Sequence, residues 1–328
     1  MNNEEIMKMN YIKDNWQNMK PTIPIAIPSY KNRNGNIVQS LDKVSENDIY
    51  VFVYEEDYEN SGYYKYDNKP NVHFVKINAN WRCISKKRFF IQQYFLNRND
   101  IKDYIMIDDD LVDGKLWTID KTKFNHIPLI NFLGVLEYAH KSLGDKRTYS
   151  CGAASDPEFG HYDFKKFNKE HGHLLQVFAI SNEFVQKSKL MFRDTELIAE
   201  DVVITHDLFK AGYNAVNFSW LKHNIKTCYR SYKTLDNSNA SAESILYKFI
   251  INTMSLLREY TKPFLINDNN FGLNFTIRPY KYWNLVQPIL DDKTKSVKEK
   301  YIELNNIFKK IEKDKKDKKQ SLEEFLTN

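Results

Sequence analysis

Apolar runs with the spacing of β-strands alternate along this chain with stretches of helical spacing. The alternating Ile23, Ile25 and Ile27 and the continuous apolar run 49–54 are two examples of the strand pattern. We expect strands at 23–28, 49–54, 72–77, 104–107, 148–154, 174–180 and 214–220. We expect helices at 37–44, 82–95, 128–143, 202–210, 244–260 and 293–318. Such alternation is typical of an α/β fold with a mostly parallel, doubly wound sheet flanked by helices.

The same pattern divides the chain into three parts. Residues 1–20 resemble a peripheral helix or arm, residues 21–238 carry the strand–helix alternation, and residues 239–328 are predicted to be a helical extension. With 328 residues, one large α/β domain and a smaller appendage fit ordinary domain sizes.

Composition narrows the class of protein. Hydrophobic residues make up 42% and aromatic residues 14% of the chain, which excludes wholesale disorder. Cys83, Cys151 and Cys228 lie far apart, so we expect free thiols in a reducing compartment. The N-terminus lacks a signal-peptide pattern, and no apolar run approaches the roughly 20 residues that span a bilayer. We therefore expect a cytoplasmic protein.

The net charge of +5 is concentrated near the C-terminus. Between Lys293 and Lys319, eleven Lys stand against five Asp or Glu. This stretch is either a solvated, highly charged helix end or an electrostatic footprint for a polyanion such as DNA.

Polar clusters follow three of the predicted strands. These clusters are Ser29-Tyr30, residues 55–57 (EED) and residues 108–110 (DDD). Ligands of doubly wound sheets bind at the carboxyl ends of the strands, so we expect the clusters to share one site. No GxGxxG or P-loop pattern is present, which argues against a dinucleotide-binding fold or a P-loop NTPase.

Three adjacent carboxylates repel one another, and a divalent cation relieves that repulsion. Mg²⁺ and Mn²⁺ prefer oxygen ligands, commonly two carboxylates and the phosphates of a substrate. Alternation along an extended segment points Asp108 and Asp110 to one side and Asp109 to the other. Asp108 and Asp110 can then share the metal while Asp109 faces a sugar hydroxyl or ribose. The alternative is an acidic turn that caps a helix.

Four segments together resemble the GT-A glycosyltransferases. YIMIDDDL resembles their DXD motif, and IPIAIPSYKNR resembles their first strand and nucleotide-binding loop. Arg82, with Lys86, Lys87 and Arg88, resembles their basic helix, and AEDVVITHDLFKAGY resembles their ED motif. The four segments occur in the family's order within roughly residues 22–230. The resemblance implies a GT-A fold and a metal-dependent transfer from a nucleotide-sugar donor, with a UDP-sugar as the expected donor and Mn²⁺ or Mg²⁺ as cofactor.

The resemblance also implies roles for individual residues. Asp201 would be the general base, with Glu200 beside it raising its pKa; alternatively, the pair only caps a helix. A third metal ligand would be His223, with His206 as the other candidate. The residues implied in donor binding are Pro28, Ser29, Tyr30, Arg33, Glu55, Arg82, Lys86, Asp108 and Asp109. A zinc site at His161, His171 and His173 is the weaker alternative, because that loop lacks Cys or closely spaced carboxylates.

The exact residues of these motifs resemble those of a narrower group, the TET-associated and phage glycosyltransferases that modify hydroxymethylated pyrimidines in DNA. IPSYKNR, the triple aspartate and LLQVFAISNEFV carry that likeness. It implies double-stranded DNA as acceptor and phage origin. Separately, a single carboxylate at Asp201 with no evident nucleophilic partner suits direct displacement with inversion at the anomeric carbon. The alternatives are transfer to a surface or capsular glycan, or a non-catalytic protein that binds nucleic acid.

Overall fold

The computed structural model describes residues 1–29, 47–58, 66–78, 83–109, 111–117, 125–154, 167, 169–170, 174, 176–225, 242–267, 269–275 and 278–327. The chain forms two compact units. The first consists of residues 1–194 and 200–228, and the second of residues 195–199 and 229–328.

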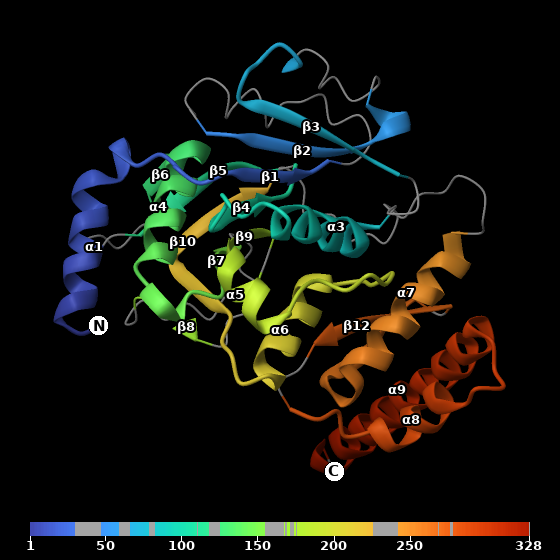
Figure 1. Cartoon of the computed structure of the whole chain (residues 1–328). Helices are drawn as coiled ribbons and strands as arrows, with labels where there is room; N and C mark the ends of the chain where they lie inside the picture. Colours follow the sequence, from blue (N-terminus) through green and yellow to red (C-terminus); the bar gives the residue numbers. More distant parts are fainter. Residues whose placement is uncertain are drawn as a thin grey trace. The chain divides into compact units, whose positions relative to one another are not determined.

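A ten-stranded sheet forms the centre of the first unit (Figure 1). Its main path has the order β3-β2-β1-β4-β9-β7-β10-β5-β6, and β8 pairs with β10. The strands are β1 (Ile25–Pro28), β2 (Ile49–Tyr54), β3 (Val72–Ile77), β4 (Asp103–Ile107), β5 (Leu111–Leu116), β6 (Asn125–Pro128), β7 (Tyr149–Ala154), β8 (Lys169–Glu170), β9 (Val177–Ser181) and β10 (Val216–Ile225). β5, β8 and β9 run against the other described strands, so the sheet is mixed but mostly parallel in direction.

Helices cover both faces of this sheet. They are α1 (Asn3–Asn15), α3 (Ile84–Leu96), α4 (Leu129–Lys141), α5 (Asn182–Ser188) and α6 (Glu200–Lys210). Successive strand residues point to opposite faces. On one face, Ile105 and Ile107 of β4 belong to the cluster that includes buried residues of α1 and α4. On the other, Tyr104 and Met106 belong to the cluster that includes buried residues of α3, α5 and α6. The first unit is thus an α/β fold of three layers.

The N-terminal segment is fixed to α4 by a close backbone approach. The Nδ2 of Asn131 donates to the carbonyls of Trp16, Gln17 and Met19, within 3.2 Å of each. A Cβ added at Gly134 would lie 2.5 Å from the carbonyl carbon of Met19, so only glycine fits there. Asn131 and Gly134 therefore hold residues 16–19 against α4.

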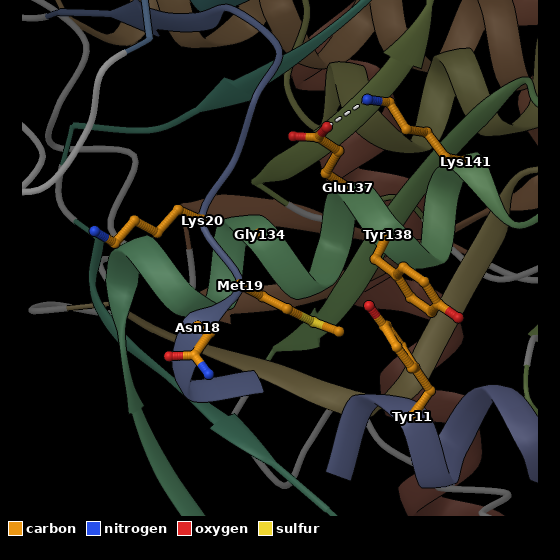
Figure 2. A pocket seen from close by; sticks show the side chains of 8 residues that line it. All are labelled: Tyr11, Asn18, Met19, Lys20, Gly134, Glu137, Tyr138 and Lys141. Carbon is orange, nitrogen blue, oxygen red and sulfur yellow. Dashed lines mark hydrogen bonds and ion pairs between the residues drawn. The ribbon is translucent and has the colours of Figure 1, made fainter. Parts of the chain in front are cut away.

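An open cavity of about 240 Å³ lies beside this junction (Figure 2). Its lining consists of Tyr11, Asn18, Met19, Lys20, Gly134, Glu137, Tyr138 and Lys141. Tyr11 and Tyr138 are stacked with their ring centroids 5.0 Å apart. Glu137 accepts hydrogen bonds from Lys141 and from the backbone and hydroxyl of Thr22. None of the lining residues belongs to the predicted site.

The second unit has its own core, built by helices and one hairpin. Its elements are α7 (Ala242–Leu257), β11 (Thr261–Asn267), β12 (Asn270–Phe275), α8 (Trp283–Asp291) and α9 (Val297–Thr327). The ring of Tyr301 on α9 stacks on Tyr247 and Phe271, with centroid distances of 3.8 and 4.5 Å. Farther along α9, Lys313, Lys315, Lys316 and Lys319 are exposed.

Most of the described elements agree with the sequence pattern, and the exceptions occur in both units. The prediction of a helical C-terminal extension omitted the antiparallel hairpin that β11 and β12 form between its helices. Two features indicate this hairpin: burial alternates with a period of two along the start of β11, and turn-forming residues lie between Asn267 and Asn270. The strands β5, β6 and β8 and the helices α5 and α8 were also not predicted. The helix expected at 37–44 lies outside the described residues.

Candidate functional site

Three of the polar clusters predicted from the sequence follow adjacent parallel strands. In the register of β1 and β2, Pro28 is beside Phe52, so Ser29 and Glu55 leave the sheet at the same edge. Ala26 of β1 is beside Met106 of β4, and two further residues along this register lead to Pro28 and Asp108. Strand order reverses between β1 and β4, because β2 and β3 lie on one side of β1 and β4 lies on the other. Such a switch point is where doubly wound sheets bind ligands.

Arg88 of α3 joins the end of β4 to the beginning of α6. Its Nη2 donates to Asp108 Oδ1 and its Nη1 to Glu200 Oε1, each at 2.6 Å. The side chain is 2% exposed. Burial alone would lower the pKa of Arg88, but Asp108 and Glu200 outweigh burial and raise it, so the guanidinium is charged at every accessible pH. The predicted metal-binding and catalytic segments are therefore linked by one permanent cation.

The two acidic residues at the start of α6 occupy different environments. Glu200 is buried and paired with Arg88, whereas Asp201 is partly exposed. Burial and then the neighbouring Glu200 carboxylate raise the pKa of Asp201 to about 7. Burial also raises the pKa of Glu200 in spite of Arg88. An Asp with a pKa near neutral suits a general base, which must accept a proton during reaction at physiological pH.

Lys87, next to Arg88 on α3, contacts the end of β1. Its Nζ donates to the carbonyl of Ser29 and lies 3.9 Å from the ring centroid of Tyr54. Burial lowers the pKa of Lys87 to about 7, and the nearby Asp109 and Asp57 partly offset this effect. The Ser29 hydroxyl is buried and has no hydrogen-bond partner among the described residues. A buried polar atom of this kind commonly binds water or a ligand.

His223 lies on β10, and the strands β9 and β7 lie between β10 and β4 in the sheet. Gln176 nevertheless connects His223 to Asp108 through two hydrogen-bonding contacts. The Gln176 carbonyl accepts a hydrogen bond from the Asp108 amide at 3.3 Å. The Gln176 side-chain oxygen lies 3.0 Å from His223 Nε2. Burial lowers the pKa of His223 to about 4, so its imidazole is neutral at physiological pH. Its Nδ1 is buried without a partner in the described part of the chain. A neutral imidazole with an unused nitrogen is a suitable metal ligand.

Several candidate residues cannot be placed in this arrangement. Tyr30, Arg33, Arg82 and Asp110 lie outside the described residues, as do His161, His171 and His173. Among the residues that the structure describes, no group of three or more His, Cys, Asp or Glu side chains could hold a metal ion. The predicted metal ligands are Asp108, Asp110 and His223, and Asp110 lies outside the described residues. The metal site therefore stays a prediction.

The remaining candidates have less distinctive surroundings. Lys86 is partly buried on the first turn of α3, where its amide donates to Cys83 Sγ at 3.5 Å. Glu55 is exposed directly after β2. His206 is buried inside α6. Cys83 and Cys151 are buried and form no disulfide, whereas Cys228 lies outside the described residues.

The sequence reasoning did not single out two residues that organise this edge of the sheet. The sequence predicts Arg88 only as part of a basic helix, but Arg88 shares its buried face with Ser85, Ile91 and Phe95. A cation at a core position of a helix is unusual and signals a buried ion pair. Gln176 has a φ of 53°, and its sequence neighbourhood offers no comparable signal.

The solved structures that resemble this chain include two with low sequence identity and low TM-scores. The crystal structure of A197 from STIV matches 62% of this chain and 84% of its own, with 15% identity and a TM-score of 0.34. The inositol-1-phosphate CTP transferase from T. maritima matches 69% of this chain and 95% of its own, with 11% identity and a TM-score of 0.39. Neither likeness carries an argument about function. No protein-family model and no curated protein matches the sequence.

No helix in the described ranges has both the length and the apolar character needed to cross a bilayer.

Proposed function

We propose that this chain is a metal-dependent glycosyltransferase of the GT-A type that uses a nucleotide-sugar donor. One observation carries the proposal: Arg88 links the strand end at Asp108 to the acidic pair at Glu200 and Asp201. The link lies at the switch point of an α/β sheet, where a nucleotide ligand is expected. Segments far apart in sequence thus contribute acidic groups to one place, as metal-assisted group transfer requires.

The residues near Asp108 are chemically suited to a divalent cation. We propose that Asp108, Asp110 and His223 would hold Mn²⁺ or Mg²⁺, with the unused Nδ1 of His223 supporting this assignment. Such an ion neutralises charge on the diphosphate of the donor. The orphan hydroxyl of Ser29, with Lys87 beside it at the end of β1, is available to orient the nucleotide.

Asp201 is the proposed general base for the acceptor hydroxyl. Its raised pKa allows it to accept a proton at neutral pH, and its partial exposure lets an acceptor approach it. Glu200 is already engaged by Arg88, which leaves Asp201 as a single base without a nucleophilic partner. That arrangement suits direct displacement with inversion at the anomeric carbon.

We propose 5-hydroxymethylpyrimidine in double-stranded DNA as the acceptor, in the cytoplasm of a phage-infected cell. The exposed lysines of α9 support this choice, because cations neutralise backbone phosphates. The second candidate is a surface or capsular glycan, for which the acceptor hydroxyl would be a sugar hydroxyl. A non-catalytic nucleic-acid-binding role is the remaining alternative.

A panel of nucleotide sugars tests the function directly. Each donor is incubated with the protein, Mn²⁺ and either hydroxymethylated or unmodified duplex DNA, and the nucleosides are analysed by mass spectrometry. We expect one donor to add a hexose or pentose mass to the hydroxymethylated duplex only. Donor hydrolysis without any DNA product would favour the glycan acceptor. Neither hydrolysis nor transfer with any donor would reject the enzyme proposal.

A further inference from the structure

We propose that Arg88 is a positioning residue that fixes the distance between the metal-binding strand end and the general base, and that Glu200 is its anchor and not a second base. The inference rests on the proposed function and goes beyond it by giving separate roles to the two acidic residues of α6. It also adds Arg88 to the residues on which the reaction depends.

The two hydrogen bonds of Arg88 use two different nitrogens of one rigid plane. Nη1 reaches Glu200 and Nη2 reaches Asp108, each at 2.6 Å. A planar guanidinium holds its donors in a fixed fork, whereas a lysine ammonium is a single point charge on a flexible stem. Only arginine can therefore keep both carboxylates at a set separation.

The guanidinium itself has little freedom to move. Its central carbon lies 4.7 Å from the ring centroid of Phe178 on β9 and 5.6 Å from that of Phe192. Packing against aromatic faces is a favourable and orienting contact for a guanidinium. The side chain is also buried, which restricts its movement further.

The three joined residues come from distant parts of the sequence. Arg88 lies on α3, Asp108 follows β4, and Glu200 begins α6. A displacement of about 1 Å between reacting groups can cost on the order of 100-fold in rate. A clamp between β4 and α6 would therefore act on the turnover number, because Asp201 follows its anchor directly in the chain.

Charge supports the same division of roles. The groups that face Asp201 are Glu200 on its own helix, Arg88 on α3 and Asp108 after β4. Of these, Arg88 lowers the pKa of Asp201, while the two carboxylates raise it. Removal of the guanidinium should thus move the pH dependence of the base to higher pH, an effect that loss of packing alone does not produce.

The test uses five variants of the full chain. Donor turnover is measured across pH for Arg88→Lys, Arg88→Met, Glu200→Gln and Asp201→Asn. Arg193→Met is the matched control, because Arg193 also pairs with an acidic residue of α6, Asp207, but has no contact with β4 among the described hydrogen bonds. Melting temperatures identify any variant that fails to fold.

We expect Arg88→Lys and Arg88→Met to lower kcat on the order of 100-fold with donor KM nearly unchanged. The pH midpoint should rise in Arg88→Met and stay in Arg88→Lys, which keeps the charge. Glu200→Gln, which keeps an oxygen for Arg88, should lose less than about 10-fold, whereas Asp201→Asn should lose at least about 100-fold. The control should behave like the wild type. Equal losses in Glu200→Gln and Asp201→Asn, or an unmoved midpoint in Arg88→Met, would overturn the inference.

A second measurement separates this inference from the proposed function. If the wild-type protein processes no nucleotide sugar, the proposed function fails, and ¹³C NMR titration of the Asp201 carboxyl still reports on Arg88. The titration midpoint should be higher in Arg88→Met than in the wild type; if Arg88→Met does not fold, Arg88→Gln takes its place. The same midpoint in both proteins refutes the role of Arg88 whether or not the chain is an enzyme.

Discussion

Replacing Asp201 with asparagine should stabilise the folded protein at neutral and alkaline pH while abolishing transfer. The folded-state pKa of Asp201 is about 7, compared with 3.8 for a free Asp side chain. The folded state therefore holds a proton that the unfolded state releases between these values. The contribution of the protonated Asp201 carboxyl to the free energy of unfolding is therefore fully present below pH 4, and it is lost as the pH rises towards 7.

The size of the effect follows from the difference of about three pKa units. At 1.36 kcal/mol for each unit, ionising Asp201 costs up to about 4 kcal/mol. Partial exposure of the residue and its shared titration with Glu200 reduce this value, so we expect roughly 2 kcal/mol. The asparagine side chain of the variant does not ionise and avoids the cost. Asp201→Asn should match the wild type near pH 4 and be more stable by about this amount at pH 8.

Urea unfolding at pH 4, 6 and 8, followed by circular dichroism, measures this difference. Asp100→Asn is a control of opposite sign, because the Arg98 guanidinium lowers the pKa of Asp100. That variant should be the less stable protein at pH 8 and converge with the wild type in acid. If Asp201→Asn is equally or less stable than the wild type at pH 8, Asp201 does not have the raised pKa on which its proposed role as a base depends.

Three other predictions concern the metal, the mechanism and the packing. Asp110→Asn should remove both transfer and Mn²⁺-dependent stabilisation by donor, as judged by activity and thermal shift; full activity of this variant in EDTA would contradict the metal assignment. The product should have the anomeric configuration opposite to that of the donor by NMR, and retention would reject direct displacement. Gly134→Ala should destabilise the protein by about 1–3 kcal/mol in urea, because its Cβ meets the Met19 backbone, while donor turnover at low temperature stays unchanged.

The sequence pattern correctly predicted the four strands on the two sides of the switch point, β1, β2, β3 and β4. The strands β1, β2 and β4 each contain an apolar run that polar residues follow, so strand position and the functional edge could be predicted together. Local patterns of this kind depend on burial of a few consecutive residues. The strands β5, β6, β8, β11 and β12 were missed. For β12, burial depends on a tertiary contact, the packing of Tyr301 on Phe271, which no local pattern specifies.

The candidate site was predictable as a set of residue types but not as a set of contacts. Asp108 and Asp201 are identifiable from their motifs alone. The pairing of Arg88 with Asp108 and Glu200 depends on how α3 packs on the sheet, and nothing in local sequence specifies a partner 112 residues away. The role of Gln176 likewise depends on a left-handed backbone at one position before β9.

The most direct test of the central claim is calorimetric titration of UDP and UDP-sugars into the protein with Mn²⁺ and with EDTA. If the edge of β1 and β4 is a donor site, at least one UDP ligand should bind with Mn²⁺ and lose most of its affinity in EDTA. At 100 times its Kd, that ligand should also stabilise the protein by about 2.7 kcal/mol. Asp108→Asn should reduce the metal-dependent part of binding. Binding of equal strength in EDTA, or no binding of any nucleotide sugar, would contradict the account.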